Sequence, residues 1–468
     1  MTLYQEIAEE IAAMIRAGIL LPGERLASVR QQRERRGISA STVFEAYYLL
    51  EARGLIVARA RSGYFVADQR VPSVPEPGPS ATAAASTRVD VSALVFEVLD
   101  AARARDIVPL GSAFASPLLF PLHSLGRSVA ASMRALDPWS TVADLAPGNA
   151  ELRRLIAQRY RQDGAQVGSD EIVITNGAME ALNLCLQAVT RPGDSVIVES
   201  PTFYAALQAL ERLGLQAIEV ATHPRGGIDL DALAEVLARG EAKACWLMTS
   251  FQNPLGSLMP DANKQALVEL LARHGVPLIE DDVYGELYFG ERRPALAKAF
   301  DREGLVMHCS SFSKCLAPGF RIGWAAPGRQ AQAVGRLKLS TSLSAPMPSQ
   351  LALADYLARG GYERHLRKLR GALAAQQAHL LDAIARHFPP GTRVTRPQGG
   401  YFLWVELPEQ VDALALHRRA LEHGISIAPG PIFSATRGFR NCVRLNYGHA
   451  WDERFEAAMV TLGRLAQA

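Results

Sequence analysis

The feature that most constrains the fold is an alternation of short apolar runs with amphipathic helical patterns, which begins near residue 93. The runs are rich in β-branched residues and have the length of buried strands: 171–175, 195–199, 244–248 and 276–280. Segments with helical periodicity lie between them, for example 179–189 and 204–213. This alternation predicts a mostly parallel sheet covered by helices. Because ligands bind such sheets at the carboxyl ends of the strands, the site residues are expected there.

A proline-rich break separates this region from the N-terminus. Four prolines stand between residues 70 and 79, and an Ala, Ser and Thr run without aromatic residues follows them. Such a segment buries little surface, so we predict a flexible linker over 70–92. A chain of 468 residues is also too long for one compact core. We therefore expect an N-terminal domain at 1–69 and a larger region at 93–468.

The first 69 residues carry the pattern of three helices followed by a hairpin. Apolar residues recur every four positions from Leu3 to Ile15, which predicts one amphipathic helix. Ser28 is the expected cap of a second, short helix, and Ser39 or Ser41 that of a third. Two apolar runs predict the strands of a hairpin: 55–59 and 63–66. Helix, helix–turn–helix and hairpin together are the layout of a winged helix.

The charge of this region agrees with a surface that faces nucleic acid. Eight arginines and three acidic residues lie between Arg25 and Arg61. A local excess of this kind suits a DNA backbone, and arginines at a hairpin tip suit a minor groove. The alternative is a small helical domain with a solvated charged face. Charge alone leaves both open.

The order of residues also resembles the GntR-type repressors. Segment 20–30 is similar to their G-x-L-x-P-G-x-x-L-P-S-x-R signature, 39–47 to their recognition helix and 59–66 to their wing. Ala27 stands where that family usually has proline, and 31–36 is more polar than its usual second helix. The resemblance implies that residues of eight positions lie at double-stranded DNA: Ser28, Arg30, Ser39, Ser41, Thr42, Arg59, Arg61 and Gly63. Hydroxyls and backbone amides would bind phosphates, and arginines would also contact guanine edges.

The most informative stretch of the larger region surrounds Lys314. This lysine lies among small hydroxyl residues directly after the apolar run 304–309. A lysine amine that is neutral part of the time forms an imine with an aldehyde cofactor. Ser311, Ser313 and Arg321 are suited to a phosphate on the same cofactor. The alternative is an exposed turn with a solvated lysine.

Other candidate residues follow the predicted strands. Gly177 opens a helix after 175, and the free backbone N–H groups at such a turn suit a phosphate. Phe203 follows the next strand, and Asn253 the one after it. Asp281 ends the strand at 276–280, where a buried carboxylate is able to pair with a protonated ring nitrogen. Each type of residue also has a purely structural interpretation: the glycine as a turn, the aromatic residue as part of the core, and the acidic residue as a helix cap.

These positions, in this order, resemble pyridoxal-phosphate enzymes of the aspartate aminotransferase fold. Residues 311–323 are similar to the family motif S-x-S-K-x-x-x-P-G-x-R-x-G. The resemblance implies an α/β fold with a large part at about 93–361 and a small α/β part at about 362–468. It implies pyridoxal 5'-phosphate as cofactor, Lys314 as the catalytic imine-forming residue, and ten cofactor-binding residues: Gly177, Ala178, Met179, Phe203, Asn253, Asp281, Tyr284, Ser311, Lys314 and Arg321. Asn253 and Arg444 would bind the substrate, with Arg444 on its α-carboxylate.

One position departs from that family. The element at 144–153 often begins with a tyrosine that reaches the phosphate bound by the partner subunit, and Ala143 stands in its place. The five cysteines are scattered without a CxxC pair, so we expect a reduced, cytoplasmic protein without a metal site. No apolar run has the length of a membrane span, and the acidic N-terminus is unlike a signal peptide.

The two halves in this order resemble the MocR group of bacterial regulators, a GntR-like winged helix fused to an aminotransferase-like region. We therefore expect a homodimeric transcription regulator that binds DNA, carries pyridoxal phosphate on Lys314, and responds to an amino acid, an amine or a vitamer. The first alternative is a working aminotransferase with a secondary DNA-binding domain. The second is a sensor of pyridoxal phosphate to which external amino acids do not bind.

Overall fold

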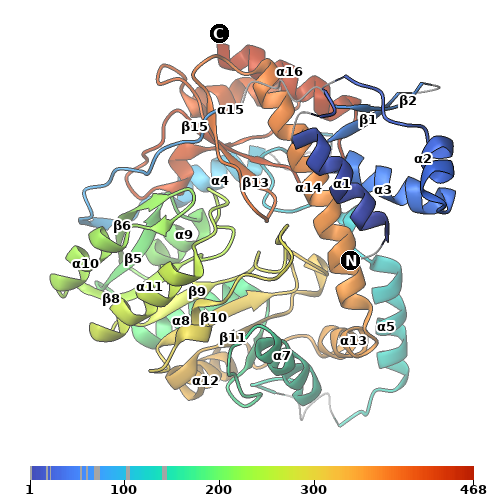
Figure 1. Ribbon diagram of the computed structural model, residues 1–468. Helices are drawn as coiled ribbons and strands as arrows, with labels where there is room; N and C mark the ends of the chain where they lie inside the picture. Colours follow the sequence, from blue (N-terminus) through green and yellow to red (C-terminus); the bar gives the residue numbers. More distant parts are fainter. Residues whose placement is uncertain are drawn as a thin grey trace.

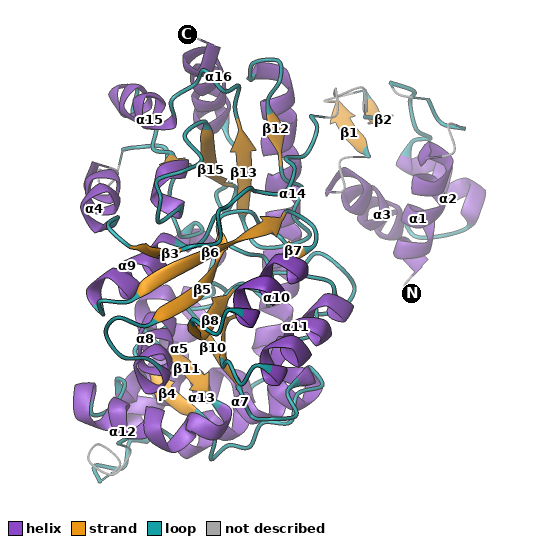
Figure 2. Ribbon diagram, turned by 90° about the vertical axis from the view of Figure 1, so that its left-hand side faces the viewer, coloured by secondary structure: helices purple, strands orange, loops and turns teal. Residues whose placement is uncertain are grey.

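The computed structural model describes residues 3–16, 19–21, 23–52, 55–59, 62–67, 74–101, 106–139 and 145–467. A small N-terminal unit lies beside a much larger body, and the long helix α14 (Gly361–His387) runs next to it (Figures 1 and 2). Helix α3 (Ala40–Ala52) of the small unit contacts α14 directly. The two halves therefore share a contact as well as a covalent connection.

The N-terminal unit has the predicted winged-helix layout. Helices α1 (Leu3–Arg16), α2 (Val29–Arg36) and α3 precede an antiparallel hairpin of β1 (Ile56–Arg59) and β2 (Gly63–Val66). Three residues of the α1 stripe, Ile7, Ile11 and Ile15, pack with residues of α3 in one buried cluster, while Leu3 at its start is exposed. Ser28 caps α2, with its Oγ accepting from the backbone N of Gln31. The predicted helices and strands are confirmed here.

The exposed position of helix α2 explains why its sequence is unusually polar. None of its residues is buried, so it needs no apolar face of its own. Arg36 instead joins it to α1, because its guanidinium donates to both carboxylate oxygens of Glu10 at 2.8 Å. This two-bond geometry helps to orient the helix, beside the contact of the partly buried Val29 with the hydrophobic cluster.

The large domain is built on one long sheet. Its strands are β3 (Ser86–Arg88), β4 (Val173–Thr175), β5 (Ser195–Ser200), β6 (Gln216–His223), β7 (Gly227–Ile228), β8 (Ala242–Leu247), β9 (Leu278–Asp281), β10 (Val306–Ser311) and β11 (Gly323–Ala326). The order across the sheet is β3-β6-β5-β8-β9-β10-β11-β4, with β7 paired to β6. Strands β6, β5, β8, β9 and β10 are parallel. The four strands expected from apolar runs are β4, β5, β8 and β9, so the mostly parallel sheet is confirmed.

Both faces of this sheet are buried. Along β5, Val196 and Val198 belong to one hydrophobic cluster and Ile197 to another. The helices that cover the sheet and flank it are α4 (Ser92–Ala101), α5 (Leu122–Arg134), α7 (Ala150–Gln162), α8 (Ala178–Val189), α9 (Tyr204–Arg212), α10 (Leu230–Ala238), α11 (Asp261–Arg273), α12 (Ala331–Ser342) and α13 (Met347–Ala358). Double coverage is why the strands are continuous apolar runs rather than alternating ones.

The C-terminal part forms a smaller layer of sheet and helices. Its four-stranded antiparallel sheet has the order β12-β13-β15-β14. The elements after α14 are β12 (Arg393–Val394), β13 (Phe402–Glu406), α15 (Ala413–Glu422), β14 (Ala428–Pro429), β15 (Cys442–Asn446) and α16 (Glu453–Gln467). Short 3-10 turns complete the chain at Pro117–Leu119, Ala297–Phe300, Pro318–Phe320, Gly328–Gln330 and Gly430–Phe433.

The segment predicted to be a flexible linker, 70–92, has defined contacts from Val74 onward. Strand β3 pairs antiparallel with the edge strand β6. The Ser80 Oγ donates to the Ser200 carbonyl at 2.6 Å, and the Pro75 carbonyl accepts from the Val394 N at 2.8 Å. The prediction of flexibility was therefore wrong for 74–92. Composition indicates only how much apolar surface a segment is able to bury. In this segment, backbone groups and small hydroxyls make the contacts instead. Residues 70–73 lie outside the described residues.

Within the described part of the chain, no helix is long and apolar enough to cross a membrane. Among the same residues, no group of three or more His, Cys, Asp or Glu side chains is arranged to hold a metal ion.

Candidate functional site

A cavity of about 180 Å³ lies at the carboxyl ends of the parallel strands. Eight of the residues predicted to bind a cofactor line it: Ala178, Met179, Phe203, Asp281, Tyr284, Ser311, Lys314 and Arg321. They come from the last residues of β9 and β10 and from the segments that follow β4, β5, β9 and β10. The remaining predicted residues, Gly177, Asn253 and Arg444, do not line the cavity itself but lie next to it through contacts described below.

Lys314 lies at the centre of this cavity wall. Its Nζ donates to the Ala113 carbonyl at 2.8 Å and stands 3.9 Å from the centre of the Phe114 ring. Burial lowers the pKa of Lys314 to about 7, and the nearby Arg444 cation adds to this effect while Asp281 opposes it. The amine is therefore neutral for much of the time near neutral pH. A neutral, oriented amine is the form that attacks an aldehyde.

Asp281 ends β9 and is almost completely buried. Its Oδ1 has no hydrogen-bond partner among the described residues. Burial raises the pKa of Asp281 to about 7, and repulsion from Asp282 adds to the shift, while Lys314 opposes it. A buried carboxylate with an unpaired oxygen fits a cationic N–H of a ring, which would satisfy both its charge and its hydrogen bond.

The raised pKa of Asp281 has a consequence for stability in protein free of ligand. Between about pH 4, the ordinary Asp value, and about pH 7, the folded state keeps a proton that the unfolded state has lost. Stability therefore falls as pH rises through this window. Asn does not titrate, so Asp281→Asn should gain stability relative to wild type across it, with an upper bound of about 4 kcal/mol.

Denaturant midpoints of wild type and Asp281→Asn at pH 4, 5, 6, 7 and 8 test this expectation. The difference between the two proteins should grow from pH 4 to pH 7 and stay level above it. A constant difference over the whole range would show that this carboxylate is ionised in the folded protein throughout.

An anion cradle lies at the other end of the cavity. Gly177 is the N-cap residue of α8, where φ is 82° and no side chain caps the first N–H groups. A Cβ at Gly177 would collide with the Arg321 guanidinium, so only glycine allows this approach. The Arg321 Nη1 also donates to the Ser313 Oγ at 3.3 Å. A helix N-terminus, a guanidinium and hydroxyls together are suited to a phosphate.

Arg444 supplies a second cationic group beside the cavity. It lies on β15, is almost fully buried, and stands 4.2 Å over the centre of the Phe402 ring. Its Nη1 donates to the Asn253 Oδ1 at 2.9 Å and its Nη2 to the Gly111 carbonyl at 2.7 Å. The Arg444 Nε and the Asn253 Nδ2 have no partner among the described residues. Two unpaired donors and a buried positive charge fit a carboxylate.

Sequence patterns missed three residues of this site. Phe114 and Tyr204 line the cavity, and Glu199, at the end of β5, accepts from the Met248 N at 2.9 Å. Burial raises the pKa of Glu199 to about 8. The signal for Glu199 was a charged residue inside an apolar run. Phe114 gave no signal, because it reaches the site from a loop before α5.

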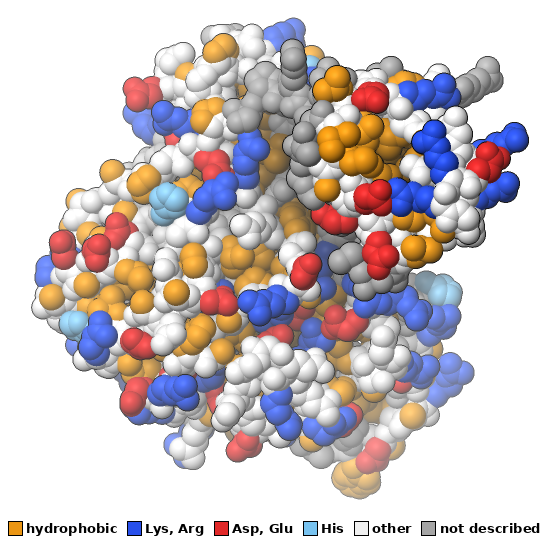
Figure 3. Space-filling view, in the orientation of Figure 1, with side chains coloured by type: hydrophobic (Ala, Val, Ile, Leu, Met, Phe, Trp, Pro, Cys, Tyr) orange, Lys and Arg blue, Asp and Glu red, His pale blue; other side chains and the backbone are white. Residues whose placement is uncertain are grey.

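The N-terminal unit exposes several of the side chains predicted to lie at DNA. The Arg30 side chain is 83 % exposed and pairs with Glu34 at 2.9 Å. At the start of α3, the Ser39 Oγ lies 2.8 Å from the Ser41 Oγ and 2.7 Å from the Thr42 Oγ1. Arg side chains gather along the outer edge of this unit, over α2 (Figure 3).

The described residues include only some of the other predicted DNA contacts of this unit. Ser28 is used as the cap of α2. Gly63 begins β2 with φ 99°, a value that favours glycine. Arg61 and the side chain of Arg59 lie outside the described residues, as does Ala143.

Comparison with known proteins agrees with both halves. Residues 144–459 match the family model described as aminotransferase class I and II, and residues 3–66 match the model of bacterial regulatory proteins of the gntR family. The fold and the cavity thus define an aminotransferase-type domain joined to a winged helix.

Two relatives cover nearly the whole chain, and a solved structure covers most of it. The HTH-type transcriptional regulator YdcR of Escherichia coli K12 is 50 % identical over 99 % of each chain, and YjiR of the same organism is 38 % identical over 99 % of this chain and 98 % of its own. LysN of Thermus thermophilus, an alpha-aminoadipate aminotransferase solved with N-(5'-phosphopyridoxyl)-L-leucine, is 32 % identical with a TM-score of 0.73, covering 81 % of this chain and 95 % of its own. The chain belongs to the GntR-family regulatory proteins that carry an aminotransferase class I and II domain, the MocR type.

Proposed function

We propose that this protein is a DNA-binding transcription regulator that carries pyridoxal 5'-phosphate on Lys314 and responds to a small amino compound. The observation that carries the proposal is the buried Lys314 amine, with a pKa lowered to about 7, in a cavity that also holds an anion cradle and the unpaired Asp281 oxygen. These three features match the aldehyde, the phosphate and the ring nitrogen of that cofactor. The winged helix on the same chain supports a role as a transcription regulator.

Each residue of the cavity has a part in this proposal. When bound, pyridoxal phosphate supplies an aldehyde and an electron-withdrawing ring. Lys314 is the residue that would hold the aldehyde, because its buried amine has a pKa lowered to about 7. The α8 N-terminus would hold the phosphate together with Ser311 and Arg321, and the Asp281 carboxylate would favour the protonated form of the ring nitrogen. The stacking residue is Phe203, while Asn253 and Tyr284 are assigned to the ring hydroxyl.

The effector class follows from Arg444. A sensor of the cofactor alone would not need a buried guanidinium with an unpaired Nε. An α-carboxylate would take that donor together with the Asn253 Nδ2, which makes an amino acid the favoured effector. An amine or a vitamer would bind without using Arg444, and this difference separates the candidates.

A route between effector and DNA also supports the regulator reading. The segment 74–80 touches both parts of the aminotransferase-type region, because Pro75 pairs with Val394 while Ser80 donates to the Ser200 carbonyl. Ser200 lies three residues before Phe203. A ligand that moves the small part against the large one would therefore act on the connection to the winged helix, and affinities for ligand and DNA would be coupled reciprocally.

A working aminotransferase is the second candidate. The 2-aminoadipate transaminase of Thermus thermophilus is 34 % identical over 79 % of this chain and 92 % of its own, and the cavity here is lined by Lys314, Asp281 and Arg321. Titrating one amino acid or keto acid at a time, with absorbance and DNA binding followed in one sample, separates the two. A ligand that changes both would support the regulator. Rapid turnover at constant DNA affinity would favour the enzyme.

Pairing into a homodimer is part of the proposal. Leu145 and Leu343 are large apolar side chains that are 40 % and 59 % exposed, and they are neighbours because the Ala146 N donates to the Leu343 carbonyl at 3.2 Å. Exposed apolar neighbours of this kind suit a protein interface. Two copies would present two winged helices to two half-sites of double-stranded DNA.

The DNA contacts are tested at Arg30. Arg30→Ala should weaken binding to the protein's own upstream DNA by about 1–3 kcal/mol if the side chain reads a base. If it contacts only a phosphate, affinity should fall for all sequences alike, and the slope of log affinity against log salt should drop by about one. Fluorescence anisotropy with operator and scrambled duplexes at several salt concentrations measures both.

The chain offers a matched control for this variant. Arg329 on the large domain is exposed and paired with Glu303 at 2.8 Å, much as Arg30 is paired with Glu34. Arg329→Ala should bind DNA like wild type. Equal affinities and equal salt slopes for Arg30→Ala and Arg329→Ala would mean that the contact has been assigned to the wrong residue.

A further inference from the structure

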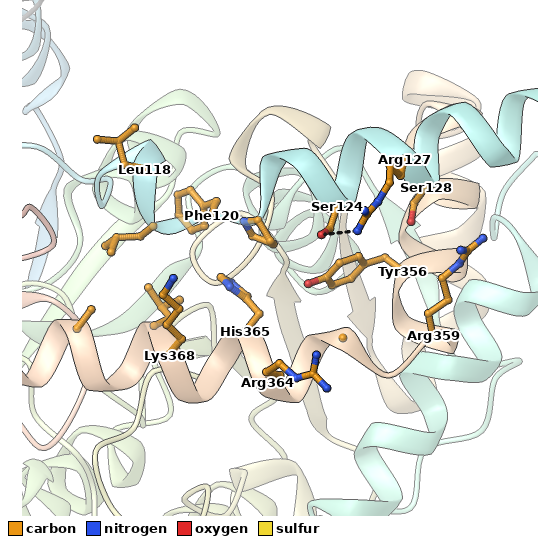
Figure 4. Close-up of a pocket in the computed structure, with 15 residues that line it drawn as sticks. Leu118, Phe120, Ser124, Arg127, Ser128, Tyr356, Arg359, Arg364, His365 and Lys368 are labelled. Atoms are coloured by element: carbon orange, nitrogen blue, oxygen red, sulfur yellow. Dashed lines mark hydrogen bonds between the residues drawn. The ribbon is translucent and has the colours of Figure 1, made fainter. Parts of the chain in front are cut away.

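A second, larger cavity lies outside the cofactor site. It is a cleft of about 480 Å³ between α5, the turn before it and the junction of α13 with α14 (Figure 4). The residues that line it are Leu118, Leu119, Phe120, Pro121, Ser124, Arg127, Ser128, Tyr356, Arg359, Gly361, Arg364, His365, Lys368, Leu369 and Ala372. None of the roles proposed above uses this cleft.

The charge in the cleft is of one sign. Of the described residues that line it, four are Arg or Lys and none is acidic. Arg359 is paired with Asp355 at 2.9 Å. Arg127 donates only to the Ser124 Oγ, at 3.3 Å, and Arg364 and Lys368 have no acidic partner in the described part of the chain. Three cations thus face one concave surface without a counter-charge from the described residues, an arrangement that suits an anionic ligand.

The two ends of the cleft differ in polarity. Leu118 and Phe120 lie at one end, and Arg127, Arg359 and Tyr356 at the other (Figure 4). Leu118 is 90 % exposed, so its apolar surface is free to cover a ligand. At the cationic end, the buried Tyr356 adds a hydroxyl group, while the Ser128 hydroxyl interacts with the Asp355 carboxylate. A ligand that fits both ends has an anionic head and an apolar or aromatic body.

We propose that this cleft binds a small organic phosphate, with the phosphate between Arg127 and Arg364 and the body against Leu118 and Phe120, at the end where Lys368 also lies (Figure 4). The volume lies within the range of small-molecule sites, about 300–1,000 Å³. A duplex backbone is the competing source of phosphate. It fits less well, because half of the cleft is apolar and a duplex backbone offers no apolar surface to cover Leu118 and Phe120.

The cleft also touches the loop that carries the cofactor lysine. His365, on the cleft wall, is buried and its Nε2 lies 2.7 Å from the Cys315 carbonyl. That carbonyl accepts, so the Nε2 carries the proton and donates. Cys315 follows Lys314 directly. A ligand that moves His365 therefore acts on the Lys314 loop through one hydrogen bond.

The site is tested by calorimetry on the full chain with two probes, inorganic pyrophosphate and adenosine 5'-triphosphate. Both should bind, and the nucleotide should bind more tightly because only it has a body for the apolar end. Arg364→Ala should weaken both probes about tenfold, the loss expected for one charge-assisted contact. Arg367→Ala is the matched control, because Arg367 is exposed on the same helix but does not line the cleft; it should bind like wild type.

Phosphate binding at the cofactor cradle must be kept apart from this result. The titration is therefore repeated in Arg321→Ala, which removes the guanidinium of that cradle, and the cleft affinity should persist there. Affinity lost in Arg321→Ala but kept in Arg364→Ala would overturn the proposal, as would the absence of binding at millimolar probe. Loss of duplex DNA affinity in Arg364→Ala, without small-anion binding, would assign the cleft to DNA instead.

The link to Lys314 has its own readout. In protein loaded with pyridoxal phosphate, saturating nucleotide should shift the visible absorption, and His365→Ala should remove the shift while the nucleotide still binds. Binding without any shift in wild type would refute the link and leave the cleft as an independent site.

Discussion

Lys314→Ala is expected to abolish covalent attachment of pyridoxal phosphate and the visible absorption band that goes with it. The reason is that, among the described residues that line the cavity, only Lys314 carries an amine, which is buried and has its pKa lowered to about 7. Non-covalent binding should persist, because Ser311, Arg321 and the α8 N-terminus remain. The expected result is thus a colour change with weakened retention of the cofactor, rather than a protein unable to bind it.

Two measurements check this expectation. Borohydride reduction followed by peptide mass spectrometry should find the adduct on the peptide with Lys314 in wild type and nowhere in the variant. Equilibrium dialysis should show cofactor bound to both proteins, more weakly in Lys314→Ala. Because attachment needs the neutral amine, its rate in wild type should rise as pH increases through about 7 and then level off. An unchanged spectrum in the variant would end the assignment of Lys314.

Arg444→Ala is expected to lose most of the affinity for ligands that carry an α-carboxylate. Truncating one partner of a buried, hydrogen-bonded charge pair costs about 2–5 kcal/mol. Arg444 is almost fully buried and already oriented by Asn253, Gly111 and the Phe402 ring. An amino-acid effector should therefore bind at least tens of times more weakly, and its effect on DNA affinity should weaken in step.

The control for this variant is a pair of ligands rather than a second residue. An amino acid and the amine formed from it by decarboxylation differ only in the group that Arg444 would bind. Spectral titration should show Arg444→Ala losing affinity for the acid while affinity for the amine stays near wild type. Arg444→Lys, which keeps the charge without the two-bond geometry, should fall between. Equal losses for both ligands would point to damage of the cavity, since Arg444 also holds Asn253.

The strands and helices of the large domain were predictable because burial on both faces leaves a strong local signal. Each of the four apolar runs became a strand, and the residues after them face one cavity, since parallel strands end on the same edge of the sheet. The winged helix was predictable for a similar reason. Its stripe from Leu3 to Ile15 and the cap at Ser28 are set by neighbours in the chain.

The segment 74–92 shows where local reasoning fails. Its composition resembles a flexible tether, but β6 presents an unpaired edge and β3 pairs with it. The prediction omitted Phe114 for a different reason, because nothing near it in the chain marks a site residue. Both depend on partners more than a hundred residues away, which no local pattern contains.

The sequence by itself determined the two-part organisation, the strand-and-helix alternation and the candidate lysine, because each depends on residues close together in the chain. Only the tertiary structure decided the burial, the pKa values and the contacts of the site residues. Burial lowers the pKa of Lys314 and raises that of Asp281, and the approach of Arg444 to Asn253 joins segments 191 residues apart. The cationic cleft between α5 and α14 is of the same kind. Burial, charge proximity and concave surfaces arise from packing, so they appear only when distant segments meet.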